Sequence, residues 1–274
     1  MSILSAVTTK NIVRPPRVVV HGCGGVGKTT FGIQACKQNN GIFIQIEDGL
    51  DSLGANNIAR FPRITKWGRT SESEDTTGQF VFYDALKSLV SENHDYKTVV
   101  IDTIDSGVPM LDEFVVETYY NGDAKKADAY KNKYGDYVRE MSKVLKAMDI
   151  LSSKGIMPIV LSHSVVENHK DPSTESYKRW EMHLPGGDKT SLGDMLYNWA
   201  DIVLFATFDV VVDTNRHGTG GNRVAYTEWS PAYDAKNRYG LPNKIQFDYN
   251  TMMSFVNKSI EPTKDTNTNK VEAK

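Results

Sequence analysis

Cysteine and long apolar runs are both scarce in this chain. Only Cys23 and Cys36 occur among 274 residues. This usage suits two free thiols in a reducing compartment and offers no metal-ligand spacing. No apolar stretch approaches the roughly 20 residues of a membrane-spanning helix, and the N-terminus lacks a charged-then-apolar secretory signal. We therefore expect a soluble, cytoplasmic protein without a membrane partner.

An excess of one charge is also missing. The 32 basic residues are matched by 34 acidic ones, which gives a net charge of −2. No global basic field favours nucleic acid, so any such surface must be a local patch. A length of 274 residues with 39 % hydrophobic content is enough for one large α/β domain with a proper core.

Glycine, in contrast, is concentrated in one short segment. The eight residues from Gly22 to Thr29 read GCGGVGKT, which matches the GxxxxGK[ST] phosphate-binding pattern, between an apolar run and a helix-like stretch. Glycines let backbone N–H groups surround a polyphosphate, Lys28 neutralises the β and γ oxygens, and the Thr29 hydroxyl ligates Mg²⁺. The sequence thus predicts an ATP and Mg²⁺ site made by Gly22, Cys23, Gly24, Gly25, Val26, Gly27, Lys28, Thr29 and Thr30.

Short apolar runs alternate with helical patterns through the first 205 residues. Strands are predicted at 18–20, 42–46, 98–101, 156–161 and 202–205, and amphipathic helices at 83–91 and 136–153. Such alternation is typical of a mostly parallel sheet covered on both faces. From residue 208 the pattern predicts antiparallel strands at 210–213, 224–229 and 244–247, with a turn at 218–221. We expect an N-terminal arm at 1–13, one domain at 14–260 and a disordered tail at 261–274.

Three polar residues follow predicted strands, at the sheet edge where ligands bind in open α/β sheets. Asp102 follows a buried strand and is the expected Mg²⁺-side acid. Glu47 is the candidate that orients and deprotonates the attacking water, with Asp48, Asp51 or a merely solvated acidic loop as alternatives. His163 could sense the γ-phosphate, although a lone histidine is more often structural. Asp105 is interpreted as a helix cap.

The order of these motifs resembles the RecA-type recombinase core. The phosphate loop is followed by Phe43–Glu47, Val99–Thr103, Leu161–His163 and Ala235–Arg238. More closely, the blocks at 177–180, 199–205 and 236–242 are similar to phage-encoded, core-only RecA-like ATPases associated with single-strand annealing proteins. The resemblance covers about residues 14–250. It implies an α/β fold with a RecA-like P-loop NTPase core, helices on both faces of the sheet and a C-terminal antiparallel extension.

The resemblance also implies residue roles. Glu47 would be the catalytic glutamate and Asp102 the Mg²⁺-side acid, while His163 stands where the family has a γ-phosphate-sensing glutamine. Lys236 and Arg238 match the paired lysines that reach a neighbouring subunit's nucleotide, with arginine as the better bidentate phosphate ligand. These positions imply a homo-oligomeric, Mg²⁺-dependent ATPase in the host cytoplasm.

Single-stranded DNA is the partner implied by two basic, aromatic regions expected to be mobile loops. Aromatic faces can stack on bases while cations follow the backbone. Acidic residues dilute both regions, and the chain has no separate terminal DNA domain. An annealing or single-strand-binding protein is the further partner that the resemblance implies. The predicted DNA-binding residues are Lys125, Lys126, Lys131, Lys133, Lys170, Lys178, Arg179 and Trp180.

Three other readings remain open from the sequence. A partition-type ATPase has a lysine where this chain has Cys23. A small-molecule kinase needs a lid of arginines, for which Arg179, Arg216 and Arg223 are candidates. An ATP-gated loader that binds an annealing protein and hydrolyses slowly or never is the non-enzymatic alternative.

Overall fold

The computed structural model describes residues 14–72, 74–129, 133–186, 191–214 and 217–260. The predicted arm at 1–13 and tail at 261–274 lie outside these residues. The strands are β1 (Val18–Gly22), β2 (Gly41–Gln45), β3 (Ala59–Arg60), β4 (Thr98–Asp102), β5 (Met157–His169), β6 (Tyr177–Met182), β7 (Ile202–Val212), β8 (Gly218–Tyr226), β9 (Lys236–Asn237) and β10 (Lys244–Gln246). The helices are α1 (Lys28–Asn39), α2 (Gly49–Ser52), α3 (Phe82–Ser91), α4 (Val108–Tyr120), α5 (Ala124–Asp128), α6 (Lys133–Ser153), α7 (Leu192–Trp199) and α8 (Tyr249–Ile260).

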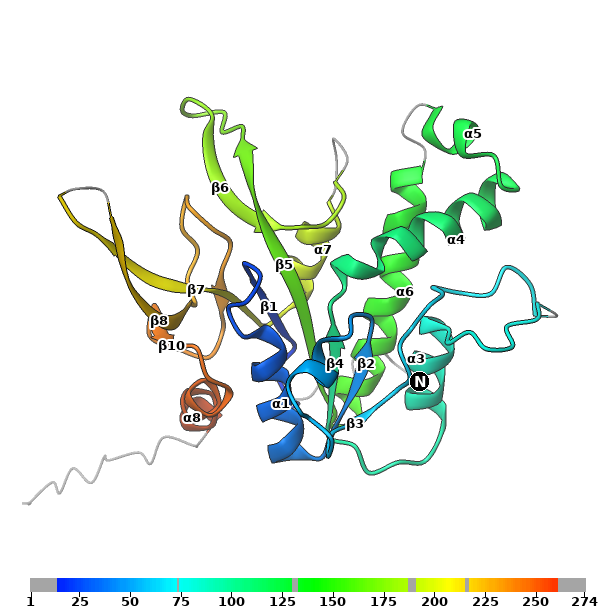
Figure 1. Cartoon of the computed structure of the whole chain (residues 1–274), viewed down its shortest axis with the longest axis horizontal. Helices are drawn as coiled ribbons and strands as arrows, with labels where there is room; N and C mark the ends of the chain where they lie inside the picture. Colours follow the sequence, from blue (N-terminus) through cyan, green and yellow to red (C-terminus); the bar gives the residue numbers. More distant parts are fainter. Residues whose placement is uncertain (1–13, 73, 130–132, 187–190, 215–216, 261–274) are drawn as a thin grey trace, which may run out of the picture.

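Eight of the ten strands follow one another in the order β10-β8-β7-β1-β5-β4-β2-β3, while β6 pairs with β5 and β9 pairs with β7. Strands β7, β1, β5, β4, β2 and β3 are mutually parallel, while β8 and β10 extend the sheet antiparallel (Figure 1). In register, Gly22 lies between His163 and Ala206, and Gln45 lies beside Asp102. The predicted α/β fold class is therefore confirmed, and the carboxyl ends of the parallel strands meet at one edge.

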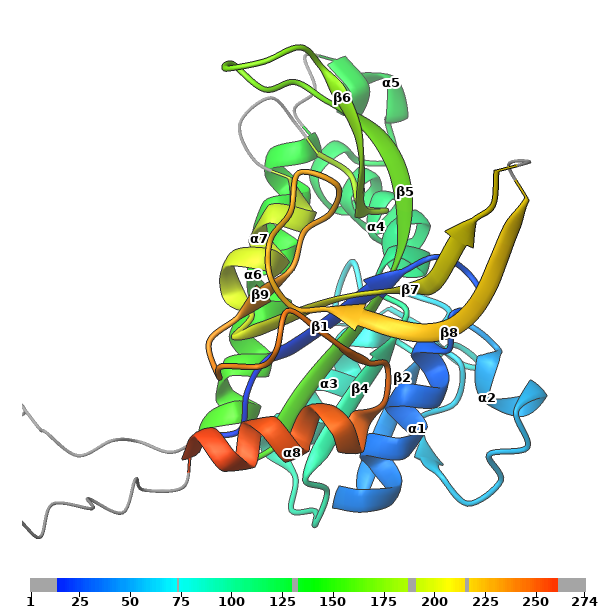
Figure 2. The ribbon, with the colours of Figure 1, turned by 90° about the vertical axis from the view of Figure 1, so that its left-hand side faces the viewer.

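Side-chain alternation along the buried strands separates two hydrophobic layers. Val19 points into the layer made with α3, α4, α6 and α7, whereas Val18 and Val20 point into the layer made with α1 and α8. Figure 2 shows α1 and α8 together on one face of the sheet, away from α6 and α7. Burial on both faces explains why these strands read as continuous apolar runs in the sequence.

Both helices that were predicted from periodicity are present, whereas α4, α5 and α7 were not predicted. The two expected amphipathic helices are α3 and α6, and α6 buries Met141, Val144 and Met148 on one side. None of the described helices combines the length and the apolar character that crossing a membrane requires.

The C-terminal third differs from the sequence prediction. Gly218–Gly221 does not form a turn but begins β8, where Gly220 and Gly221 adopt φ values of 113° and 150° next to a bulge at Asp209/Val210. Those conformations suit glycine, and a run of glycines at a β-bulge has the same sequence pattern as a turn. The last described element is α8, a helix that the strand-rich prediction did not include.

The segment after His163 is also more regular than expected. β5 continues to His169 and pairs antiparallel with β6, from Ser164 opposite Met182 to His169 opposite Tyr177. The prediction of a loop here is therefore wrong, because most of that segment is a β-hairpin; its mobility stays a prediction. Figure 1 shows this hairpin projecting from the carboxyl edge of the sheet.

Candidate nucleotide site

The glycine-rich segment forms a loop between β1 and the start of α1, as the sequence predicts. A Cβ on Gly22 would lie 2.2 Å from the Ala206 carbonyl oxygen, so only glycine fits at the strand end. Gly25 and Gly27 have φ values of 76° and 103°, in the region that favours glycine. The loop therefore leaves its backbone N–H groups at the N-terminus of a helix, where anions bind.

Lys28 lies across the interior of this loop. Its Nζ donates hydrogen bonds to the carbonyl oxygens of Gly22 and Cys23, each at 3.0 Å. The side chain is buried, and this desolvation lowers the pKa of the ammonium group. A cation held in this position can neutralise phosphate oxygens that enter the loop.

Thr29 and Asp102 meet beside the loop. The Thr29 hydroxyl hydrogen-bonds the Asp102 carboxylate, and a Cβ on Gly49 would lie 3.3 Å from Thr29 Oγ1 and 3.7 Å from Asp102 Oδ2. Burial, with the nearby Glu47 charge, raises the pKa of Asp102 to about 6. Among the described residues, none hydrogen-bonds the buried Asp102 Oδ1. A hydroxyl and an unsatisfied carboxylate oxygen fit Mg²⁺, which prefers oxygen ligands.

Glu47 lies two residues after the end of β2, at the same edge of the sheet. Its Oε1 accepts hydrogen bonds from Thr103 Oγ1 at 2.9 Å and from Ser106 Oγ. Its backbone N–H donates to the Asp102 carbonyl oxygen at 3.2 Å, which fixes Glu47 next to the acid at the end of β4. The side chain is 37 % exposed, so water can reach it. A carboxylate held in this way can accept a proton from water.

Asp105 is not the helix cap that we predicted. Its Oδ1 accepts from the His163 backbone N–H at 2.8 Å, and its Oδ2 accepts from His163 Nδ1 at 2.9 Å. This hydrogen bond raises the pKa of His163 and fixes its ring 3.7 Å from Glu47 Oε1. The sequence prediction missed Asp105, Thr103 and Ser106 as positioning residues; the available signal was a run of polar side chains immediately after a buried strand.

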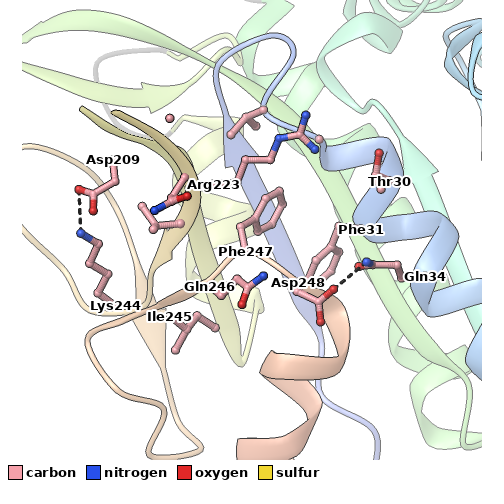
Figure 3. Close-up of a pocket in the computed structure, with 15 residues that line it drawn as sticks. Thr30, Phe31, Gln34, Asp209, Arg223, Lys244, Ile245, Gln246, Phe247 and Asp248 are labelled. Carbon is pink, nitrogen blue, oxygen red and sulfur yellow. Dashed lines mark hydrogen bonds and ion pairs between the residues drawn. The ribbon is translucent and has the colours of Figure 1, made fainter. Parts of the chain in front are cut away.

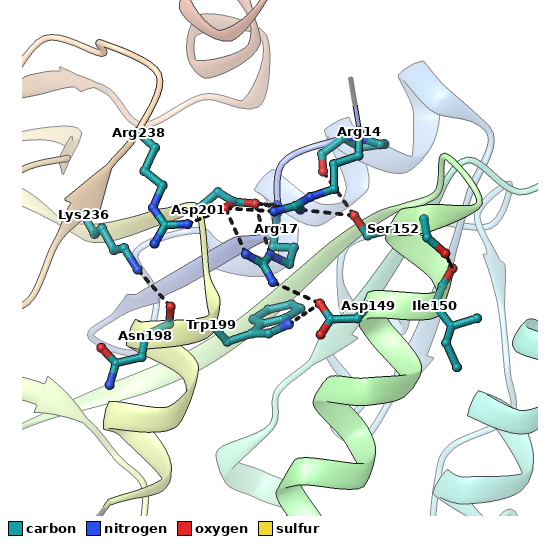
Figure 4. Close-up of polar contacts among 12 residues, drawn as sticks. Arg14, Arg17, Asp149, Ile150, Ser152, Asn198, Trp199, Asp201, Lys236 and Arg238 are labelled. Carbon is teal, nitrogen blue, oxygen red and sulfur yellow. Dashed lines mark hydrogen bonds and ion pairs between the residues drawn. The ribbon is translucent and has the colours of Figure 1, made fainter. Parts of the chain in front are cut away.

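Lys236 and Arg238 lie at the opposite edge of the sheet from the phosphate loop. Lys236 pairs with Val203 near the start of β7, whereas the loop adjoins Ala206 farther along. Lys236 Nζ donates to the carbonyl oxygens of Tyr197 and Asn198, and Arg238 Nη1 lies 3.0 Å from Asp201 Oδ1 (Figure 4). The pair therefore does not reach the nucleotide site of its own chain.

The first predicted DNA region is helical in its described part. Lys125 and Lys126 are exposed on α5, while Lys133 pairs with Asp128 at 2.5 Å and with Asp112 at 3.2 Å. Lys131 lies outside the described residues. Two of the four predicted lysines in this region are thus both exposed and without an ion pair among the described residues.

The second predicted DNA region is the β5–β6 hairpin and its turn. Lys170 and Lys178 are exposed. Arg179 is only 5 % exposed and pairs with Asp234 at 2.5 Å, so it is a buried structural residue and not the DNA contact that we predicted. Trp180 is partly buried, with its ring centroid 6.0 Å from that of Phe205. The burial of Arg179 also removes it as a kinase lid arginine.

Comparison with known protein families matches residues 14–239 to the model of the AAA domain. No curated protein matches the chain. The matched range contains the phosphate loop, Glu47, Asp102 and His163, and it covers most of the chain. The chain therefore belongs to the AAA domain family of P-loop nucleoside triphosphatases.

Proposed function

We propose that the chain is a Mg²⁺-dependent ATPase of the RecA-like type that acts on single-stranded DNA. The observation that carries the ATPase proposal is the meeting of Lys28, Thr29, Asp102 and Glu47 at the carboxyl edge of the sheet. These four side chains come from three separate parts of the sequence, and each has the chemistry that phosphoryl transfer to water requires.

Each of these residues has a separate role in hydrolysis. The loop N–H groups and Lys28 hold the polyphosphate, and Thr29 and Asp102 would hold the metal. When bound, Mg²⁺ neutralises charge on the β- and γ-phosphate oxygens. Thr103 and Ser106 both bind Glu47 Oε1, and none of the described residues hydrogen-bonds Oε2. Oε2 is thus left to accept a proton from the attacking water.

His163 connects this site to the β5–β6 hairpin. Asp105 accepts from His163 Nδ1 and raises the pKa of the ring, and in the protonated ring Nε2 can donate to a γ-phosphate oxygen. His163 is also the residue from which β5 continues into the hairpin that carries Lys170 and Lys178. Occupation of the γ-phosphate position can therefore bias the hairpin that would contact DNA.

The DNA surface in this proposal is smaller than the sequence predicted. It consists of Lys125 and Lys126 on α5 and of Lys170 and Lys178 on the hairpin. Figure 1 shows α5 and the hairpin on the same side of the molecule. Cations in this arrangement can follow a single-stranded backbone without reading its sequence. An annealing protein is the partner that the resemblance to phage RecA-like ATPases favours.

The test is phosphate release from ATP in Mg²⁺ buffer, with and without single-stranded DNA. We expect hydrolysis that DNA stimulates and that Lys28→Ala abolishes through loss of ATP binding, because neutral N–H dipoles cannot replace a full charge. An unchanged nucleotide affinity in Lys28→Ala would contradict the site. Hydrolysis that a metabolite stimulates and DNA does not would favour a small-molecule kinase.

A further inference from the structure

Arg223 differs from every other arginine that the structure describes. Each of the others lies within 4.0 Å of a carboxylate, whether at the surface or buried. Arg223 is exposed on β8, and no described carboxylate pairs with it. An arginine without an acid partner is available to an anionic ligand, for which its planar fork of donors is well suited.

The guanidinium group of Arg223 lies against the phosphate loop. A Cβ built on Gly27 would be 3.2 Å from Arg223 Nη1, so the guanidinium group lies in tight van der Waals range of the loop at Gly27. Figure 3 shows Arg223 reaching from β8 toward the start of α1. In loops of this kind the backbone cradles the α- and β-phosphates, while the lysine reaches the β and γ oxygens.

The order of the strands gives the direction in which a bound nucleotide runs. β4 and β2, which carry Asp102 and Glu47, lie on one side of β1, and β7 and β8 lie on the other. The γ-phosphate is expected beside Glu47, because Glu47 would take the proton from the water that attacks it. The nucleoside end of the bound nucleotide must then extend from the loop toward β8, where Arg223 lies.

A pocket of about 760 Å³ lies at that position. It adjoins the loop at Gly27 and the start of α1 at Thr30, and its walls are β8, β10 and the two residues that follow β10 (Figure 3). Its volume is within the range of small-molecule sites, roughly 300–1,000 Å³. Asn222 and Gln246 supply amide groups, and Phe247 supplies a ring that stacks on Phe31 with centroids 5.3 Å apart. These groups suit the polar edge and the flat face of a nucleobase.

We propose that Arg223 binds the α- and β-phosphates of the nucleotide held by its own chain, and that the adjoining pocket receives the nucleoside. This inference rests on the proposed nucleotide-binding function and adds to it a phosphate ligand on β8. Because the α- and β-phosphates are present before and after hydrolysis, Arg223 contributes equally to ADP and ATP binding.

The experiment measures the affinities of ADP and of inorganic tripolyphosphate for the full chain by calorimetric titration. Arg223→Ala should weaken both ligands by about 10- to 100-fold, because each loses a charge-assisted hydrogen bond. Asn222→Trp, which fills the pocket from the same strand, should weaken ADP by about tenfold and leave tripolyphosphate unchanged. Arg69→Ala, an exposed arginine paired with Asp84, is the matched control and should change neither affinity.

Wild-type affinity for both ligands in Arg223→Ala would overturn the inference while the proposed ATPase function stood. Equal weakening of ADP and tripolyphosphate in Asn222→Trp would overturn the nucleoside pocket. A wild-type chain that binds neither ligand would contradict the proposed function itself and this inference with it. Arg223 and Asn222 are both exposed, and a thermal melt of each variant checks that it is folded.

Discussion

At the residue scale, His21 joins the phosphate loop to two distant segments. It directly precedes Gly22 and is fully buried. Its Nε2 donates to the Asp234 carbonyl oxygen at 2.7 Å, so Nδ1 accepts from the Ser164 hydroxyl at 2.9 Å. Burial lowers the pKa of His21 to about 4. The folded protein thus requires a neutral ring at this position.

His21 therefore predicts a loss of stability in acid. An unfolded chain has an ordinary histidine pKa of about 6.5, so between pH 6.5 and about 4 only the unfolded state binds the proton. The free energy of unfolding should fall as the pH drops through that window, by at most about 1.4 kcal/mol per pH unit from this group. Urea unfolding of wild type and His21→Gln between pH 4.5 and 7 measures it. Parallel pH profiles for the two proteins would contradict this role.

The principal site residues could be predicted because they stand at strand ends or inside a recognisable loop. Lys28, Thr29, Asp102 and Glu47 need only the parallel sheet to bring them together. The role of Asp105 could not be read in this way, because Asp105 lies three residues beyond the end of β4 and its contact with His163 depends on the path of the chain after that strand. Arg179 was misinterpreted for a similar reason, since its burial depends on Asp234 in a separate segment.

At the element scale, Asp201 connects the segment before β1 and the residue that follows β9 to the start of β7. Its carboxylate hydrogen-bonds Arg14, Arg17 and Arg238 (Figure 4). Burial works to raise its pKa, but the hydrogen bonds from Arg17 and Arg14 outweigh burial and hold the pKa below its ordinary value. The Asp201 side chain is 5 % exposed, so loss of its charge leaves three arginines without their shared partner.

Asp201→Asn should accordingly lower the free energy of unfolding by about 3 kcal/mol at pH 7. Asp149→Asn is the control and should cost under about 1 kcal/mol, because Asp149 is 50 % exposed. The Asp201 contribution is present above the ordinary aspartate pKa of about 4 and is lost as the pH falls below it. Denaturant titration at pH 7 and pH 3 checks both points. An equal loss of unfolding free energy in the two variants at pH 7 would show that Asp201 contributes no more than an exposed ion pair does.

The β5–β6 hairpin carries the element-scale prediction about DNA. Lys178 is exposed on β6, and Lys258 is an exposed lysine on α8, which Figure 2 shows at the other end of the molecule. If Lys178 neutralises one phosphate, Lys178→Ala should reduce the salt dependence of single-stranded DNA binding by about 0.7 in the log–log slope. Lys258→Ala should leave the slope unchanged. Equal slopes in fluorescence titrations of wild type and Lys178→Ala would remove the hairpin from the DNA surface.

Whether a helix or strand could be predicted from the sequence depends on how much of it is buried. Strands buried on both faces are visible as apolar runs, and α6 is visible because one side of it is buried. The hairpin was missed since Glu167, Asn168 and Lys178 are exposed and interrupt any apolar alternation. α8 was missed because its buried face rests on only a few residues, among them Met252 and Val256.

At the scale of the whole molecule, the placement of Arg238 bears on assembly. Because Arg238 lies away from its own phosphate loop, it can assist hydrolysis only at a neighbouring subunit's nucleotide. Mixing Arg238→Ala with Lys28→Ala should then restore part of the ATPase activity that each variant lacks, since an arginine supplied by a neighbour contributes about 10³-fold or more. Phosphate release across mixing ratios measures this. Activity that never exceeds the sum of the separate variants would argue against completion between subunits.

The fold class and the presence of a phosphate loop could be predicted at this scale, whereas the family could be predicted only coarsely. A phosphate loop followed by acids at strand ends is common to P-loop proteins, and the family model that matches is the AAA domain. The RecA-like assignment rests on sequence segments later in the chain, such as Lys236–Arg238. Their expected contact with a neighbouring subunit's nucleotide could be seen only in an assembly of several subunits.

The most direct test of the central claim is the turnover of Glu47→Gln, measured with its ATP affinity in the same preparation. Glutamine can keep the hydrogen bonds from Thr103 and Ser106 but cannot take a proton from water. We predict ATP binding close to that of wild type and a kcat at least about 10²-fold lower. Wild-type turnover in Glu47→Gln, with ATP bound, would show that Glu47 is not the base and would contradict this account of the site.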